Sequence, residues 1–210
     1  MAKVSRKQIL QDYRTRSLLE STRRLIAAHG FDAVTMERVA QDAGITKGGI
    51  YLYFRNKDQM ILAAIEEIMD TMVRSITDTA GTHESPWDQL CQLIRAQLTI
   101  MEQNKDLLRT LLVDRRLMRD GTAGGTSRRL LKYRRRHESE IEAILVRGIK
   151  QKVFCPMDTG QAAFYINEMT ISTAQRRFLG FTRSSLAEAA EALLCFVGLL
   201  LQKRKLAKAG

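Results

Sequence analysis

The sequence predicts an all-α fold of about nine helices. Apolar residues recur at helical spacing over long stretches, runs of β-branched residues are few, and the 210 residues include only two prolines. Hydrophobic residues make up 45% of the chain, which is enough for a packed core, and glycine and proline are too scarce for a disordered chain.

The first three helices are predicted within residues 15–54. A helix over 15–29 is expected to stop at Gly30. Thr35 is a natural N-cap for a second helix, whose inner face would be Met36, Val39 and Ala40.

The second and third helices are joined by a predicted glycine turn. Gly44 should end the second helix, because a residue with positive φ at this position is most stable without a Cβ atom. Thr46 then caps a third helix that runs to about Phe54. Two short helices around a tight turn predict a helix-turn-helix, whose second helix enters the DNA major groove.

Six further helices are predicted, each with a recognisable start. Asn56, with Gln59 three residues later, resembles a capping box and starts the fourth helix without any preceding linker. The remaining helices are expected over about 85–101, 104–119, 127–152, 158–180 and 185–205, with a glycine-containing loop at 121–127. We therefore expect a DNA-binding domain at 1–56 and a ligand-binding and dimerisation domain at 57–210, linked through the shared fourth helix.

The last helix has an apolar arc too wide for one neighbour to cover. Projected at about 100° per residue, its apolar positions span roughly 220°, which favours a second copy of the chain as the additional partner. A helix buried inside a larger monomer is the alternative. The residues predicted at the dimer interface are Leu186, Ala190, Leu193, Phe196, Val197 and Leu200.

Positive charge is concentrated where the helix-turn-helix is predicted. The chain carries 34 Lys and Arg against 23 Asp and Glu, a net charge of +11. Residues 1–57 hold 11 basic and 5 acidic residues, a net of +6, in about a quarter of the chain. Because the excess coincides with the motif, DNA is the expected polyanion and not a membrane.

The cysteine pattern and the hydropathy indicate a cytoplasmic protein. Cys91, Cys155 and Cys195 are odd in number and widely spaced, which suits reduced thiols and not disulfides or a zinc site. The N-terminus lacks the apolar core of a signal peptide, and the longest apolar run, 192–201, is far shorter than the ~20 residues that span a bilayer. No metal and no cofactor are expected.

Residues 14–62 resemble the N-terminal domain of TetR-type (tetracycline-repressor-like) transcriptional regulators. The matching residues are Gly30-Phe31, Thr35, Val39-Ala40, Ala43 to Thr46, Gly48, Ile50-Tyr51, Tyr53-Phe54 and Lys57. The chain departs from the family pattern at Met60, usually Leu, and at Leu52, where many members carry a larger aromatic residue.

The resemblance implies that Lys47, Gly48 and Tyr51 face the major groove and that Thr46, Tyr53 and Lys57 contact phosphates. Lys47 can reach guanine O6 and N7 as a point charge, and paired glycines would allow close backbone approach to DNA. The complete predicted DNA-binding set is Thr35, Thr46, Lys47, Gly48, Gly49, Tyr51, Leu52, Tyr53 and Lys57.

Two further features of the C-terminal domain leave alternatives open. An effector pocket is predicted from Trp87, Met101, Met118, Tyr133, Phe164, Tyr165 and Met169, although most of these residues are equally consistent with plain core. A basic run, Arg128, Arg129, Lys132, Arg135 and Arg136, lies within roughly 120° of one helix face. This run suits either a solvated surface or an anion site.

Together these features predict a homodimeric, ligand-responsive repressor of a pseudo-palindromic DNA operator. The effector is expected to be apolar or an anionic amphiphile. The alternative is a DNA-binding adaptor that recruits a protein partner without a small-molecule switch. An enzyme is not expected, because no nucleophile, phosphate-loop or metal pattern is present.

Overall fold

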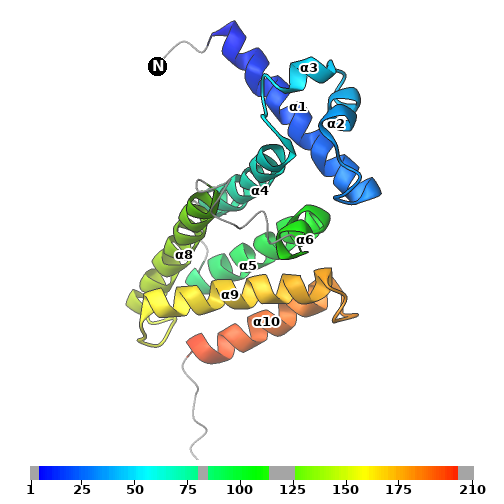
Figure 1. The fold of residues 1–210 in the computed structure, drawn as a ribbon. Coiled ribbons are helices and arrows are strands. Elements are labelled where there is room, and N and C mark those ends of the chain that lie inside the picture. Colours follow the sequence, from blue (N-terminus) through cyan, green and yellow to red (C-terminus); the bar gives the residue numbers. More distant parts are fainter. Residues whose placement is uncertain (1–4, 80–84, 114–125, 203–210) are drawn as a thin grey trace, which may run out of the picture. The chain divides into compact units, whose positions relative to one another are not determined.

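The computed structural model describes residues 5–79, 85–113 and 126–202, and in those ranges the chain forms nine α-helices and no strand (Figure 1). The helices are α1 (Arg6–His29), α2 (Met36–Asp42), α3 (Lys47–Ile50), α4 (Lys57–Thr79), α5 (Pro86–Gln103), α6 (Lys105–Val113), α8 (Thr126–Lys150), α9 (Thr159–Phe178) and α10 (Leu186–Leu201). The predicted all-α fold is confirmed.

The helices form two compact units. One contains residues 1–68 and 104–129, and the other contains residues 69–103 and 130–210. Helix α4 therefore passes from the first unit into the second after Ile68. The first unit includes α6 as well as the three N-terminal helices.

Helix α1 begins nine residues earlier than the predicted start at Thr15. Ser5 is its N-cap, and the Ser5 hydroxyl accepts from the amide of Gln8 at 3.2 Å. The additional turns carry Ile9, Leu10 and Tyr13, all exposed. The sequence prediction missed them because it relied on a buried apolar face, whereas a polar cap starts the helix without one.

The core of the first unit is built around the middle of α1. Leu18 and Ile26 are buried there, together with Val39 of α2, Ile50 of α3 and Met60 of α4. The Arg23 guanidinium of α1 forms a half-buried ion pair with Glu67 of α4 at 2.9 Å. These contacts fix the short helices α2 and α3 on a longer helical support.

The core of the second unit lies among α5, α8, α9 and α10. Leu90, Ile94 and Leu98 of α5 and Ile141 and Leu145 of α8 are fully buried. Where α8 ends, Gly148 leaves room for a buried ring, because a Cβ atom there would lie 2.0 Å from Cδ2 of Phe154.

Helices α9 and α10 start at the predicted caps. The side chain of Asp158 accepts from the amide of Gln161, and Ser185 and Glu188 form a complete capping box. Helix α10 ends at Leu201, because Gln202 is extended, so the predicted end near Lys205 is wrong.

Candidate functional site

The helix-turn-helix segment is held by local hydrogen bonds. The hydroxyl of Thr35 accepts from the amide of Arg38 at 3.2 Å and so caps α2. Gly44 has φ of 67°, as the turn prediction required, and the amide of Ile45 donates to the carbonyl of Ala40 at 2.9 Å. The hydroxyl of Thr46 then accepts from the amide of Gly49 at 3.1 Å and caps α3. Both predicted caps and the predicted glycine turn are confirmed.

Gly48 and Gly49 differ in what surrounds them. A Cβ atom on Gly48 would meet no atom within 4 Å. A Cβ atom on Gly49 would lie 3.1 Å from the Thr46 hydroxyl oxygen and 4.0 Å from Ile45. Gly48 is therefore open to the outside, while Gly49 faces the cap of its own helix.

Helix α3 is shorter than predicted. It ends at Ile50, and residues 51–53 continue as a turn in which the amides of Tyr53 and Phe54 both donate to the carbonyl of Ile50. Ile50 and Phe54 are buried and anchor this turn. Gly48 and Gly49 lower the helix propensity of this segment, which explains why α3 ends at Ile50 and a turn leads on to Phe54.

Between these anchors the predicted DNA-binding side chains are displayed outward. Leu52 is 82% exposed and Tyr51 is 48% exposed, while Tyr53 is half-buried. At this exposure the Leu52 side chain makes little contact with the rest of its own chain. The surface from Gly48 to Leu52 is therefore available to a partner.

Lys47 is held at the edge of this surface by an acidic residue. Its ammonium lies 2.8 Å from the carboxylate of Glu37 on α2, and both side chains are exposed. The hydrogen bond between them raises the pKa of Lys47 and lowers the pKa of Glu37. An incoming anion must therefore compete with Glu37 for Lys47.

Lys57 is positioned differently from Lys47, the other basic residue of the predicted set. Its ammonium donates to the carbonyl of Phe31 at 2.6 Å and lies 4.0 Å from the centre of the Phe31 ring. Because the side chain is half-buried, Lys57 ties the start of α4 to the loop between α1 and α2. Sequence reasoning gave no sign of this structural contact.

Six of the seven predicted effector-pocket residues lie within the described residues, and two of them line different hollows. Trp87 lines a hollow of about 440 Å³ between α5 and α10, and Met169 lines a different hollow between α9 and α10. Met101 is buried, Tyr133 is half-buried, and Phe164 and Tyr165 are exposed on α9, in edge-to-face contact with each other. Met118 lies outside the described residues.

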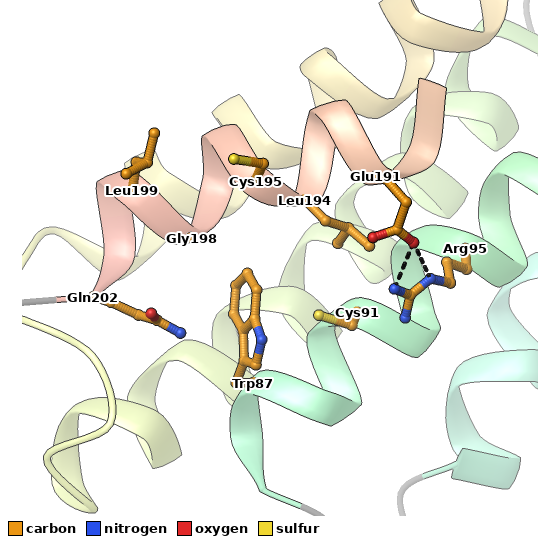
Figure 2. Close-up of a pocket in the computed structure, with 9 residues that line it drawn as sticks. All are labelled: Trp87, Cys91, Arg95, Glu191, Leu194, Cys195, Gly198, Leu199 and Gln202. Carbon is orange, nitrogen blue, oxygen red and sulfur yellow. Dashed lines mark hydrogen bonds and ion pairs between the residues drawn. The ribbon is translucent and has the colours of Figure 1, made fainter. Parts of the chain in front are cut away.

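Figure 2 shows the hollow beside Trp87, with Cys91 on α5 and Cys195 on α10. Arg95 spans the two helices through an ion pair to Glu191 at 2.7 Å. Gly198 allows the approach of Trp87, whose ring would lie 3.0 Å from a Cβ atom there. Burial raises the pKa of Cys91 to about 11, so its thiol stays protonated and unreactive at neutral pH.

A buried polar cluster links α5, α8 and α9 and was not predicted. His137 Nε2 lies 2.8 Å from Gln97 Oε1, and Gln97 Nε2 donates to Asn167 Oδ1 at 3.2 Å. Asn167 in turn donates to Glu138, which is paired with Arg134 at 3.0 Å. The available signal was the presence of polar residues at core-facing helical positions, such as Gln97 between Ile94 and Met101.

Helix α10 buries only part of its predicted interface. Ala190, Leu193 and Val197 are buried within the chain and Leu186 is half-buried, whereas Phe196 and Leu200 are exposed. Leu199, beside them, is 60% exposed. We call Phe196, Leu199 and Leu200 the α10 stripe.

The basic run on α8 is described only in part. Lys132, Arg135 and Arg136 are exposed, and the side chains of Arg128 and Arg129 lie outside the described residues. Across the described residues, the three cysteines are free and no group of His, Cys, Asp and Glu is arranged to hold a metal ion.

Comparison with known proteins identifies the family. Residues 18–64 match the family model for "Bacterial regulatory proteins, tetR family", and residues 83–175 match "Tetracyclin repressor-like, C-terminal domain". The chain belongs to the TetR family of transcriptional regulators. The resemblance predicted over residues 14–62 is confirmed and extends into the C-terminal helices.

Relatives within the TetR family are distant in sequence. The chain is 32% identical over 77 residues to the uncharacterised regulator YfiR of Bacillus subtilis, a match that spans only 37% of each protein. It is 26% identical over 160 residues to the uncharacterised regulator YhgD of the same organism, covering 76% of this chain and 81% of YhgD. A TetR regulator from Haloarcula marismortui superposes with a TM-score of 0.77 at 21% identity, over 91% of this chain and 100% of that structure.

The TetR assignment defines the general function of the chain. Its family and fold are those of DNA-binding transcriptional regulators and not of enzymes. Within the described residues, no helix has the length and apolar character needed to cross a bilayer.

Proposed function

We propose that this protein is a ligand-responsive repressor that binds a pseudo-palindromic operator as a homodimer and is released by a small-molecule effector. The observation that supports DNA reading most directly is the outward surface from Gly48 to Leu52, anchored by buried Ile50 and Phe54. A repressor acting on chromosomal DNA would work in the bacterial cytoplasm.

The chemistry of this surface suits a DNA major groove. Leu52 offers an apolar contact for a thymine methyl group, and Lys47 offers a donor for guanine O6 or N7. Gly48 would let the backbone approach the bases closely. The hydroxyl of Thr46 accepts a helix amide, so its O–H group can donate to a phosphate.

The α10 stripe supports a homodimer. Phe196, Leu199 and Leu200 are between 51% and 60% exposed on a helix that also buries Leu193 and Val197 within the chain. A second copy of the same helix would cover this stripe through a two-fold interface, in which each stripe meets its equivalent. Two recognition segments would then read half-sites about one helical turn, ~34–36 Å, apart.

Release of the operator needs only a moderate coupling energy. An effector that binds the DNA-free form about a hundredfold more tightly than the DNA-bound form supplies ~3 kcal/mol, which lowers operator affinity by the same factor. The helical core of α5, α8 and α9 is the proposed effector region, because it contains buried polar groups that an apolar core does not require.

A matched pair of glycine substitutions tests the DNA-reading surface. The duplex is first selected from random sequences by the parent protein. Gly48→Ala adds a methyl group to open space, so the fold should be kept while affinity for the selected duplex falls at least tenfold. Gly49→Ala adds the same methyl group toward Thr46 and Ile45 and should keep affinity within about threefold.

Affinities measured by fluorescence anisotropy, with circular dichroism to check folding, decide the result. Equal affinity of Gly48→Ala and the parent would contradict the proposed surface. Tight operator binding that no extract of the host cell can reverse would instead favour the adaptor alternative.

A further inference from the structure

The carboxylate of Glu138 determines which group donates and which accepts in each hydrogen bond of the buried polar cluster. Glu138, ion-paired with Arg134, can only accept hydrogen bonds, so Asn167 must present its NH₂ group to it. The oxygen of Asn167 then accepts from the NH₂ group of Gln97. The remaining oxygen of Gln97 faces His137 Nε2 at 2.8 Å, so Nε2 must carry the proton and donate.

This order leaves the other ring nitrogen of His137 as a bare acceptor. A neutral imidazole has one N–H, and here it is on Nε2. The ring is neutral at physiological pH because burial lowers the pKa of His137 to about 4. The side chain is 7% exposed, and Nδ1 is the buried side-chain atom for which the described residues supply no hydrogen-bond partner.

Helix geometry places Met101 of α5 and Tyr133 of α8 one turn from this acceptor. Arg147 donates to Gln89, and His137 to Gln97, so α8 and α5 run antiparallel at this point. The next turn in the direction of the α8 N-terminus therefore places Tyr133 of α8 level with Met101 of α5. Helical side chains lean toward the N-terminus of their helix, so the His137 ring leans toward this turn.

The local charges disfavour an anion. Arg134 is shared between Glu138 on α8 and Glu168 on α9, so the cluster has two carboxylates for one guanidinium. A carboxylate ligand would meet the lone pair of Nδ1 as well as this acidic excess. A neutral donor such as a hydroxyl or an N–H group is repelled neither by the Nδ1 lone pair nor by the two carboxylates.

We propose that His137 Nδ1 accepts a hydrogen bond from a neutral hydroxyl or N–H group of the effector, whose apolar body contacts Met101 and Tyr133. The proposal rests on the proposed function in placing the effector among α5, α8 and α9. It narrows the expected effector class to uncharged donor-bearing molecules and argues against the anionic amphiphile considered from the sequence.

Nitrogen NMR on the full-length protein labelled with ¹⁵N-histidine tests this assignment without knowledge of the natural effector. The probes are phenol, anisole and benzoate, which share a ring and differ as a neutral donor, a neutral molecule without a donor, and an anion. Loss of a resonance in His137→Gln identifies the ring, and exposed His29 serves as an internal control.

The free protein should show His137 in the Nε2–H form, and phenol should shift the Nδ1 resonance at roughly tenfold lower concentration than anisole or benzoate. The His29 resonance should not distinguish the three probes. A proton on Nδ1 in the free protein, or an Nδ1 resonance that phenol does not move, would overturn the proposal.

Operator binding separates this proposal from the proposed function. If a host-cell extract releases the operator equally from the parent and from His137→Gln, ligand control stands and the His137 assignment fails. If phenol shifts Nδ1 but neither phenol nor an extract alters operator binding, the acceptor site stands and ligand control of repression fails.

Discussion

The recognition segment and helix α10 both expose apolar side chains, but in very different surroundings. Leu52 projects from a short turn between Tyr51 and Tyr53, and a local cap holds the backbone of this segment. The α10 stripe groups three neighbouring apolar side chains near the end of a 16-residue helix. One exposed aliphatic side chain suits contact with a base edge, whereas a group of neighbouring apolar side chains suits another protein surface.

The largest expected effect comes from a charge within the α10 stripe. Phe196→Asp places a carboxylate in each half of the proposed two-fold interface, where two like charges would be desolvated together. We expect the homodimer to dissociate to monomers at micromolar concentration in sedimentation velocity. Operator affinity should fall at least a hundredfold, because a monomer reads one half-site.

Val146→Asp is the matched control for this substitution. Val146 is 49% exposed on α8, and we propose no partner for it. This variant should remain dimeric and bind the operator as the parent does. A dimeric Phe196→Asp protein would show that the α10 stripe is not the dimer interface.

A second prediction concerns His137 and the stability of the helical core. The folded-state pKa of His137 is about 4, below the ordinary value of 6.5, so between these values the unfolded chain binds a proton that the folded chain does not. Stability should therefore be unaffected by this group above pH 6.5 and should fall as the pH is lowered, by roughly 3 kcal/mol near pH 4.

Urea unfolding of the parent and of His137→Gln between pH 7.5 and pH 4.5 measures this contribution. Arg134 and Glu138 of α8 and Glu168 of α9 are present in both proteins, so the difference between the two profiles reports the substituted residue. His29→Gln removes an exposed histidine and should keep the parent's pH profile. Identical profiles for the parent and His137→Gln would mean that the ring is not held neutral by burial.

Local signals explain why much of the helix-turn-helix could be predicted from the sequence. Thr35 and Thr46 cap helices through bonds to residues three positions away, and Gly44 adopts a positive φ that its residue type favours. The residues in these interactions lie within about one helical turn of each other, so a local sequence pattern predicts them. The contact of Lys57 with Phe31 spans 26 positions, and no local pattern indicates it.

The second unit was less predictable because its features depend on neighbours distant in the sequence. Periodicity identified the apolar residues of α10 but could not show that Leu193 and Val197 face the chain's own core while Phe196 faces outward. In the same way, Gln97 and His137 are 40 positions apart, and each looked isolated in the sequence. The starts of helices could be predicted here, whereas the sequence did not show which face of each helix packs against which neighbouring helix.

The smallest expected effect concerns Glu37, and it sharpens the assignment of the recognition segment. Glu37→Gln frees Lys47 from its 2.8 Å ion pair and removes a negative charge from the surface that approaches phosphates. We expect about a threefold to tenfold gain in affinity for DNA at low salt and a salt dependence that is steeper by about one counterion. Anisotropy titrations of the selected duplex over a series of salt concentrations measure both.

Glu20→Gln provides the control, because Glu20 is an exposed acid that pairs with Arg24 within α1 at 3.3 Å. A general effect of net charge would increase DNA affinity equally in the two variants. A gain confined to Glu37→Gln would mean that DNA competes with this carboxylate for Lys47. The Lys47–Glu37 ion pair would then weaken non-specific DNA binding. Only a duplex that offers Lys47 a matching base edge would compensate for breaking this ion pair.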